Sequence, residues 1–132
     1  MAVEVNLTPL SVDAFSPYPG QGAIAIVART DDVQTIEMLK KIEDADSRLE
    51  IEAERALSDY IDSGCRFPLG AYAKSDGNEM NLTVYAFSVD GKQSLQVTKS
   101  GDKNNPNLLG KQVGEELRSK GRNDVALNWS EK

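Results

Sequence analysis

The chain has 132 residues, of which 39% are hydrophobic and 27% are charged, a composition typical of a soluble globular domain rather than a disordered segment. Its formal net charge of -6 argues against nucleic acid or an anionic membrane as the main partner, because both attract clustered Lys and Arg side chains. With one cysteine and no histidine, the composition excludes an intrachain disulfide and Ser-His-Asp or Cys-His catalysis, and we expect no metal site because the commonest zinc ligand is missing.

Residues 1–44 contain the first predicted elements. The opening MAVEVNLTPL lacks the basic start and apolar stretch of a secretory signal, and no apolar run approaches the roughly 20 residues of a membrane-spanning helix, so we expect a cytoplasmic protein. Residues 1–19 are punctuated by prolines and predict a connector. The apolar run at 22–28 predicts a strand covered on both faces, and apolar residues at helical spacing predict a helix over 32–43.

The strongest helical pattern covers residues 46–62. Ser47 and Glu50 have the spacing of a capping box, and Asp44 or Asp46 offers an alternative cap. One apolar stripe follows the helix: Leu49, Ala53, Ala56, Leu57 and Tyr60. This stripe predicts a helix that packs one face on a core.

The rest of the chain predicts a sheet followed by a helix. Three strands are expected, at 69–75, 80–88 and 92–99. Asp90 and Gly91 are typical of a hairpin turn between the second and third strands. Asn105 is expected to cap a helix over 107–120, and Gly121 to end it. The predicted fold is α+β: a small antiparallel three-stranded sheet with helices packed on one face, preceded by a strand-helix segment from a preceding domain.

Cys65 is the first candidate for chemistry, because it follows the strong helix in a loop where Gly64 and Pro68 restrict the backbone. Two interpretations stay open from the residues alone. A lone cysteine can be a small buried hydrophobe. Alternatively, the adjacent Arg66 favours the thiolate, which attacks carbon electrophiles. The absence of a histidine base argues against a protease-type or acyl-transfer cysteine.

Two other patterns are given structural interpretations. Residues 20–25 (GQGAIA) match the G-x-G-x-x-A dinucleotide fingerprint, but prolines precede them and a predicted strand follows, which is the reverse of what that fingerprint requires. We therefore reject a nucleotide site and expect the glycines to permit a close turn. Four carboxylates of the strong helix are expected to form a solvated face: Glu52, Glu54, Asp59 and Asp62.

Two blocks of the sequence together resemble one family. Residues 17–29 (PYPGQGAIAIVAR) are similar to the "PAPGQGALAIE-R" segment of porphobilinogen deaminases. Residues 52–57 (EAERAL) and 64–73 (GCRFPLGAYA) resemble the family's "AERA" and "GGC-x-x-P-x-G-A-Y-A" region, at a matching separation. Clear similarity covers residues 15–73. Ser63, where the family often has Gly, is a mild departure.

The resemblance implies an enzyme of tetrapyrrole (haem) biosynthesis, a transferase that deaminates porphobilinogen and joins the units head to tail into hydroxymethylbilane. It also implies a dipyrromethane cofactor, held by a thioether to the cysteine that aligns with Cys65. Gln21 and Gly22 are expected to neighbour this cofactor. Loss of ammonia from an aminomethylpyrrole leaves an electrophilic methylene that a soft thiolate captures well, so Cys65 would act as an anchor rather than a turnover nucleophile.

The resemblance further divides the chain. Residues 1–44 are expected to be the tail end of the preceding domains (connector, strand and hinge helix), and 45–132 a C-terminal cofactor-anchoring domain. The missing N-terminal domains would supply the substrate- and cofactor-binding arginines and the catalytic aspartate, so we expect no catalytic residue here and no activity of the chain alone. Without flanking strands, residues 1–30 should be poorly ordered, or residues 20–30 should self-associate. The alternative is a noncatalytic α+β interaction module.

Overall fold

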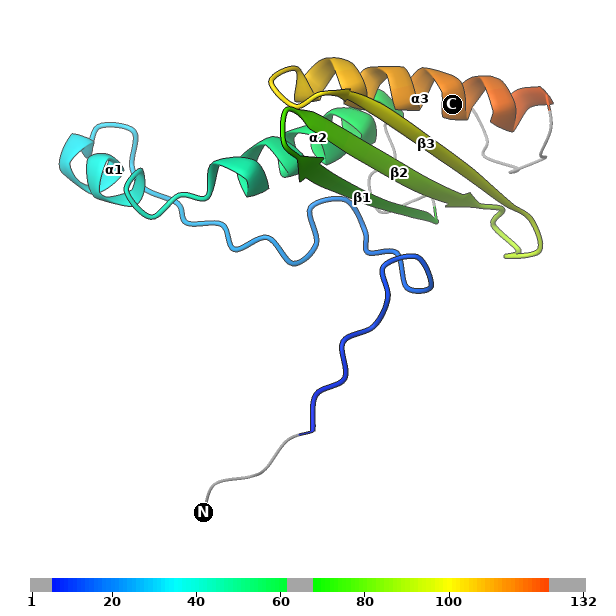
Figure 1. Cartoon of the computed structure of the whole chain (residues 1–132), viewed down its shortest axis with the longest axis horizontal. Coiled ribbons are helices and arrows are strands. Elements are labelled where there is room, and N and C mark those ends of the chain that lie inside the picture. Colours follow the sequence, from blue (N-terminus) through cyan, green and yellow to red (C-terminus); the bar gives the residue numbers. More distant parts are fainter. Residues whose placement is uncertain (1–5, 62–67, 124–132) are drawn as a thin grey trace.

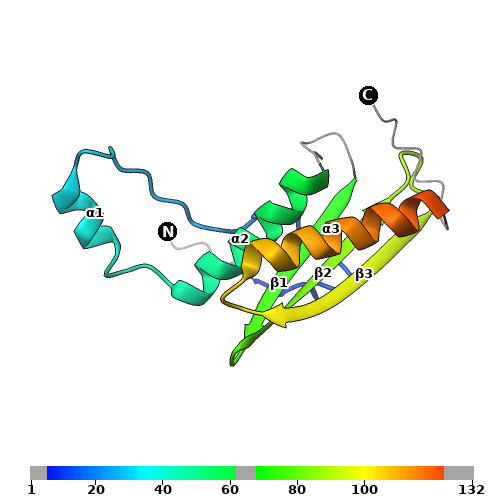
Figure 2. The same ribbon diagram turned by 90° about the horizontal axis from the view of Figure 1, so that it is seen from above.

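The computed structural model describes residues 6–61 and 68–123 and shows a three-stranded antiparallel sheet with two long helices on one face (Figures 1 and 2). The order of elements in these ranges is α1 (Val33–Leu39), α2 (Ala45–Ile61), β1 (Leu69–Asp76), β2 (Glu79–Phe87), β3 (Ser94–Asp102) and α3 (Pro106–Asn123). The α+β prediction is confirmed. No helix in these ranges is long and apolar enough to cross a membrane.

The sheet has the order β1-β2-β3 and is built from two hairpins. Ala71 pairs with Val84 of β2, and Val84 in turn pairs with Val97 of β3. A tight turn at Gly77, with φ of 59°, joins β1 to β2. The longer connection from β2 to β3 contains Gly91, with φ of 69°, so the hairpin predicted there is confirmed.

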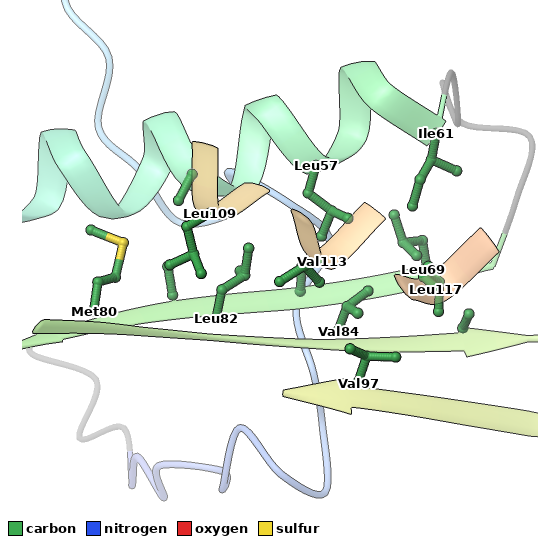
Figure 3. Close-up of a cluster of buried hydrophobic side chains, with 14 residues drawn as sticks. Leu57, Ile61, Leu69, Met80, Leu82, Val84, Val97, Leu109, Val113 and Leu117 are labelled. Atoms are coloured by element: carbon green, nitrogen blue, oxygen red, sulfur yellow. The ribbon is translucent and has the colours of Figure 1, made fainter. Parts of the chain in front are cut away.

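The core lies between the sheet and the helices α2 and α3, where apolar side chains from both layers meet (Figure 3). Alternate residues of β2 point into it, as the period of a strand requires. The largest fully buried apolar side chains are Leu57, Met80, Leu82, Val84, Val97, Val113 and Leu117. Burial of a side chain of this size contributes about 1.5–3 kcal/mol, which makes this cluster the main source of stability.

The structure shows which residue caps α2 and where α3 begins and ends. The Oδ1 atom of Asp44 accepts the Ser47 N–H at 2.7 Å, so Asp44 caps α2 and the Ser47 capping box does not form. This bond lowers the pKa of Asp44. The Asn105 carbonyl accepts the first N–H bonds of α3, as expected at the cap position. The prediction that Gly121 ends α3 is wrong, because a glycine weakens a helix without breaking it and the helix continues to Asn123.

A glycine of α3 allows the two long helices to approach closely. A Cβ atom at Gly110 would lie 2.4 Å from the carbonyl oxygen of Ala53 and 2.8 Å from the backbone nitrogen of Leu57. A Cβ at Gly114 would lie 2.6 Å from the ring of Tyr60. The clash at Gly110 is with backbone, which cannot shift cheaply, so this position requires glycine.

We expect Gly110→Ala to lower the free energy of unfolding by about 2 kcal/mol, because overpacking outweighs the gain of about 1 kcal/mol in helix propensity. Urea unfolding followed by circular dichroism measures this. Gly114→Ala is the graded comparison and should cost less, since the Tyr60 side chain can move. A Gly110→Ala protein as stable as the original would contradict this close packing.

The apolar run at 22–28 does not form the predicted strand. Ile24 is 94% exposed and Val27 93% exposed, and the run has no strand partner in the described residues. A strand forms only when a neighbouring backbone can exchange hydrogen bonds with it. The helix predicted over 32–43 is confirmed over a shorter span, Val33–Leu39, and buries no residue. So short a helix is expected where no packing extends it.

Candidate functional site

The connector that carries the first block of the resemblance lies beside strand β1. The Pro17 carbonyl accepts the Ala71 N–H at 2.8 Å. Next to this contact, a Cβ atom at Gly70 would lie 2.7 Å from the Oγ atom of Ser16, so a larger residue would push the connector away. The connector is therefore seated on the outer edge of the sheet.

The connector then makes a turn that orients the Gln21 side chain. The Gln21 N–H donates to the Tyr18 carbonyl at 2.9 Å, and the Tyr18 N–H donates to Gln21 Oε1 at 3.0 Å. Gly20 and Gly22 have φ of 74° and 88°, values that strongly favour glycine. Because an N–H must donate to oxygen, the side-chain amide has one allowed orientation. Gln21 is exposed, and its Nε2 donors make no hydrogen bond within residues 6–61 and 68–123.

Glu54 joins this turn to the helix and the sheet. Its Oε2 accepts the Gly20 N–H at 2.7 Å, and its Oε1 accepts the Ala73 N–H at 2.8 Å. Glu54 is only 7% exposed, so the expectation that it belongs to a solvated face is wrong. The physical reason is that both oxygens find backbone donors, which allows a carboxylate to be buried.

The surroundings of Glu54 change its acidity. Burial raises the pKa of Glu54, and this effect exceeds the opposing hydrogen bonds from Ala73 and Gly20. The negative charge of Glu50 raises it further. The folded chain therefore binds a proton at Glu54 more readily than the unfolded chain does.

Glu50 repeats the same contact one helical turn earlier. Its Oε1 accepts the Ser75 N–H at 2.7 Å and lies 3.7 Å from the Nζ atom of the exposed Lys74. Residues four apart on a helix rise about 6 Å, and alternate strand residues about 6.7 Å, so Glu50 and Glu54 match the spacing of Ser75 and Ala73. Together with Pro17 they satisfy alternate N–H groups on the outer edge of β1.

The structure places some of the predicted site residues and not others. Gln21 and Gly22 lie in the turn beside Glu54, whereas Cys65 and Arg66 lie outside the described residues. Glu52 lies on the surface, where its Oε1 atom is 3.8 Å from the Nη1 atom of Arg48. Asp59 is also exposed, and Asp62 lies outside the described ranges. No group of three or more metal-ligating side chains occurs in 6–61 and 68–123.

Glu54 is the residue that sequence reasoning assigned wrongly. A usable signal was present: Glu50 and Glu54 directly follow Leu49 and Ala53, and so flank the apolar stripe rather than oppose it. A carboxylate at the border of a buried stripe can reach across to an edge strand. The helical period alone does not show that such a strand is there.

Comparison with known proteins gives the family. Residues 48–119 match the family model described as "Porphobilinogen deaminase, C-terminal domain". The chain belongs to this family. It is 75% identical over its whole length to a protein of Nitrosopumilus maritimus named "Probable porphobilinogen deaminase", and 43% identical over 117 residues to the "Porphobilinogen deaminase" of Brevibacillus brevis.

The relatives of this porphobilinogen deaminase domain are much longer than the chain. The match covers 42% of the Nitrosopumilus protein and 37% of the Brevibacillus protein. A third relative, the "Porphobilinogen deaminase" of Alkaliphilus metalliredigens, is 34% identical over 116 residues, with 37% of its length matched. The chain thus spans less than half the length of these curated relatives.

We expect Glu54→Ala to lower the free energy of unfolding by about 2 kcal/mol at neutral pH, because the Gly20 and Ala73 N–H groups lose their acceptor. Denaturant unfolding measures the change. Glu115→Ala, at an exposed position of α3, is the matched control and should change stability by less than about 0.5 kcal/mol. Equal effects of the two substitutions would show that the Glu54 contacts contribute nothing.

The raised pKa of Glu54 predicts a pH dependence that Glu54→Gln should remove. A carboxyl group with a raised folded pKa contributes most stability below its ordinary value of 4.5, and this contribution is lost as pH rises through the folded value. Relative to the Gln variant, the unsubstituted chain should therefore become less stable as pH rises through this window. Unfolding midpoints of both proteins at several pH values test the sign, and a difference independent of pH would contradict it.

Proposed function

We propose that the chain is the cofactor-carrying C-terminal part of a porphobilinogen deaminase, a transferase that condenses porphobilinogen into hydroxymethylbilane. One observation supports this most strongly. The two sequence blocks that resemble the family meet at one carboxylate, since Gly20 comes from the first block, and Glu54 and Ala73 come from the two parts of the second. Blocks far apart in the chain that share one buried contact are expected to act as one unit.

In this proposal Cys65 anchors a dipyrromethane cofactor through a thioether. The cofactor supplies the acceptor to which pyrrole units are added, and the tether keeps the growing chain at high effective concentration. Cys65 lies between the end of α2 and the start of β1 in the sequence. These are the two elements that Glu54 links.

The residues of the turn fit such a ligand. The resemblance implies a cofactor that carries carboxylate side chains, and the Nε2 donors of Gln21 are suited to bind a carboxylate oxygen. A Cβ atom at Gly20 or Gly22 would meet nothing within 4 Å, so the backbone there is open to close approach. We assign Gln21 and Gly22 to the cofactor side of the turn. The acidic chain leaves neutralisation of the remaining carboxylates to arginines of the upstream domains.

We also propose that residues 1–44 belong structurally to the upstream domains and 45–132 to the C-terminal domain. Exposed apolar side chains at Ile24 and Val27 support this, because such residues are normally buried when flanking strands are present. The greater length of the relatives leaves room for those strands. Residues 22–28 would then become a strand only in the longer protein.

Mass spectrometry of the longer protein, with the upstream region of the relatives attached, tests the function. We expect a dipyrromethane adduct on the peptide that contains Cys65 and bilane formation from porphobilinogen, because the thiolate is the proposed anchor. Cys65→Ser should abolish both. The 132-residue chain alone should form no bilane.

Two results would contradict the proposal. An active longer protein whose Cys65 peptide is unmodified would exclude the anchoring role. A folded longer protein without adduct or turnover would favour a noncatalytic interaction module.

A further inference from the structure

We propose that Glu54 is a positioning residue, whose carboxylate holds the Tyr18–Gln21 turn at a fixed place beside β1 and so fixes the direction of the Gln21 Nε2 donors. This inference rests on the proposed function, because it concerns the same cofactor site. Neither the resemblance nor the family match assigns any role to this carboxylate.

The Glu54 carboxylate takes the place of a neighbouring strand at the edge of β1. The outer edge of β1 offers N–H groups at Ala71, Ala73 and Ser75. The connector itself supplies an acceptor only at the first of these, through the Pro17 carbonyl. Beyond that point the Glu54 carboxylate lies between the edge and the connector: Oε1 accepts the Ala73 N–H and Oε2 accepts the Gly20 N–H. The carboxylate thus spaces the turn away from the sheet at a set separation.

Only a carboxylate of this length satisfies both the Gly20 and the Ala73 N–H groups. Gln at this position has one accepting oxygen, and its NH2 group would face the other N–H group. The remaining acceptor would go to Ala73, because an unsatisfied N–H inside the sheet edge costs more than one in the half-buried turn at Gly20. Asp is shorter by one methylene and cannot reach both. Either change breaks the hydrogen bond to the Gly20 turn and keeps the one to Ala73 in the sheet.

The turn that Glu54 holds also orients the Gln21 side chain. The side-chain oxygen Oε1 of Gln21 accepts the Tyr18 N–H inside the same turn that Gly20 anchors to Glu54. The buried Glu54 carboxylate therefore sets the direction of the Nε2 donors, because it holds Gly20 and so the turn in which the Tyr18 N–H binds Gln21 Oε1. Displacement of a positioning group by about 1 Å can cost a reaction about a hundredfold.

Amide hydrogen exchange on the 132-residue chain tests the contact without any assay of activity. We expect Glu54→Gln to speed exchange of the Gly20 amide at least tenfold. Glu50→Gln is the matched control, one helical turn away; its one accepting oxygen can keep the Ser75 N–H, so both Ser75 and Gly20 should stay protected. If the Gly20 amide of the unsubstituted chain exchanges as fast as in an unstructured peptide, the positioning role is overturned.

Kinetics of the longer protein test the consequence. We expect Glu54→Gln to lower kcat, per molecule that carries the adduct, at least tenfold, with a smaller change in KM. A merely structural role would lower the yield of folded, loaded protein and leave kcat per loaded molecule unchanged, as we expect for Glu50→Gln.

The two arms separate this inference from the proposed function. If the unsubstituted longer protein carries no adduct, the proposed function fails, and the exchange data alone decide whether Glu54 fixes the turn. If that protein is active and Glu54→Gln retains its full kcat per loaded molecule, the proposed function stands and the positioning role is overturned.

Discussion

A single buried carboxylate connects the parts of this molecule that are far apart in the chain. Glu54 lies on α2. It accepts one N–H from strand β1 and a second from Gly20, in the turn that comes before both α1 and α2 in the chain. Burial of a charge is costly unless its hydrogen-bonding capacity is filled, and here both oxygens have backbone donors. The sheet edge and the connector are consequently held in one arrangement, since either one alone would leave half of the carboxylate unsatisfied.

The same contact helps to satisfy the N–H groups on the outer edge of strand β1. A strand at an edge exposes unpaired N–H groups that can recruit another chain. On β1 these groups are taken by Pro17, Glu54 and Glu50, so the edge is closed by the protein's own residues. The situation at 22–28 is the opposite: apolar side chains are exposed and no strand partner lies within the described ranges. In the described residues, the β1 edge is thus closed, whereas the apolar side chains at 22–28 stay exposed.

The match to the porphobilinogen deaminase family covers most of α2, the whole sheet and most of α3. In the sequence, Cys65 comes between the long helix α2 and the first strand β1, and the glycine turn is tied to both elements through Glu54. Close packing of α2 and α3 at Gly110 holds the helix against the sheet from the other side. The sheet and the two long helices of the described residues are therefore held together from both sides of α2.

The sequence by itself determined the fold class, the order of the elements and the family. Apolar periodicity located α2, the strands and α3, because burial of one face dictates that pattern directly, and the spacing of the motifs identified the relatives. The sequence could not determine whether 22–28 forms a strand, since pairing requires a neighbouring backbone that the apolar run does not encode. Only the tertiary structure revealed that Glu54 is buried: its position beside the apolar stripe is equally compatible with solvent, and the two N–H groups that make burial favourable come from residues 34 positions before and 19 positions after it.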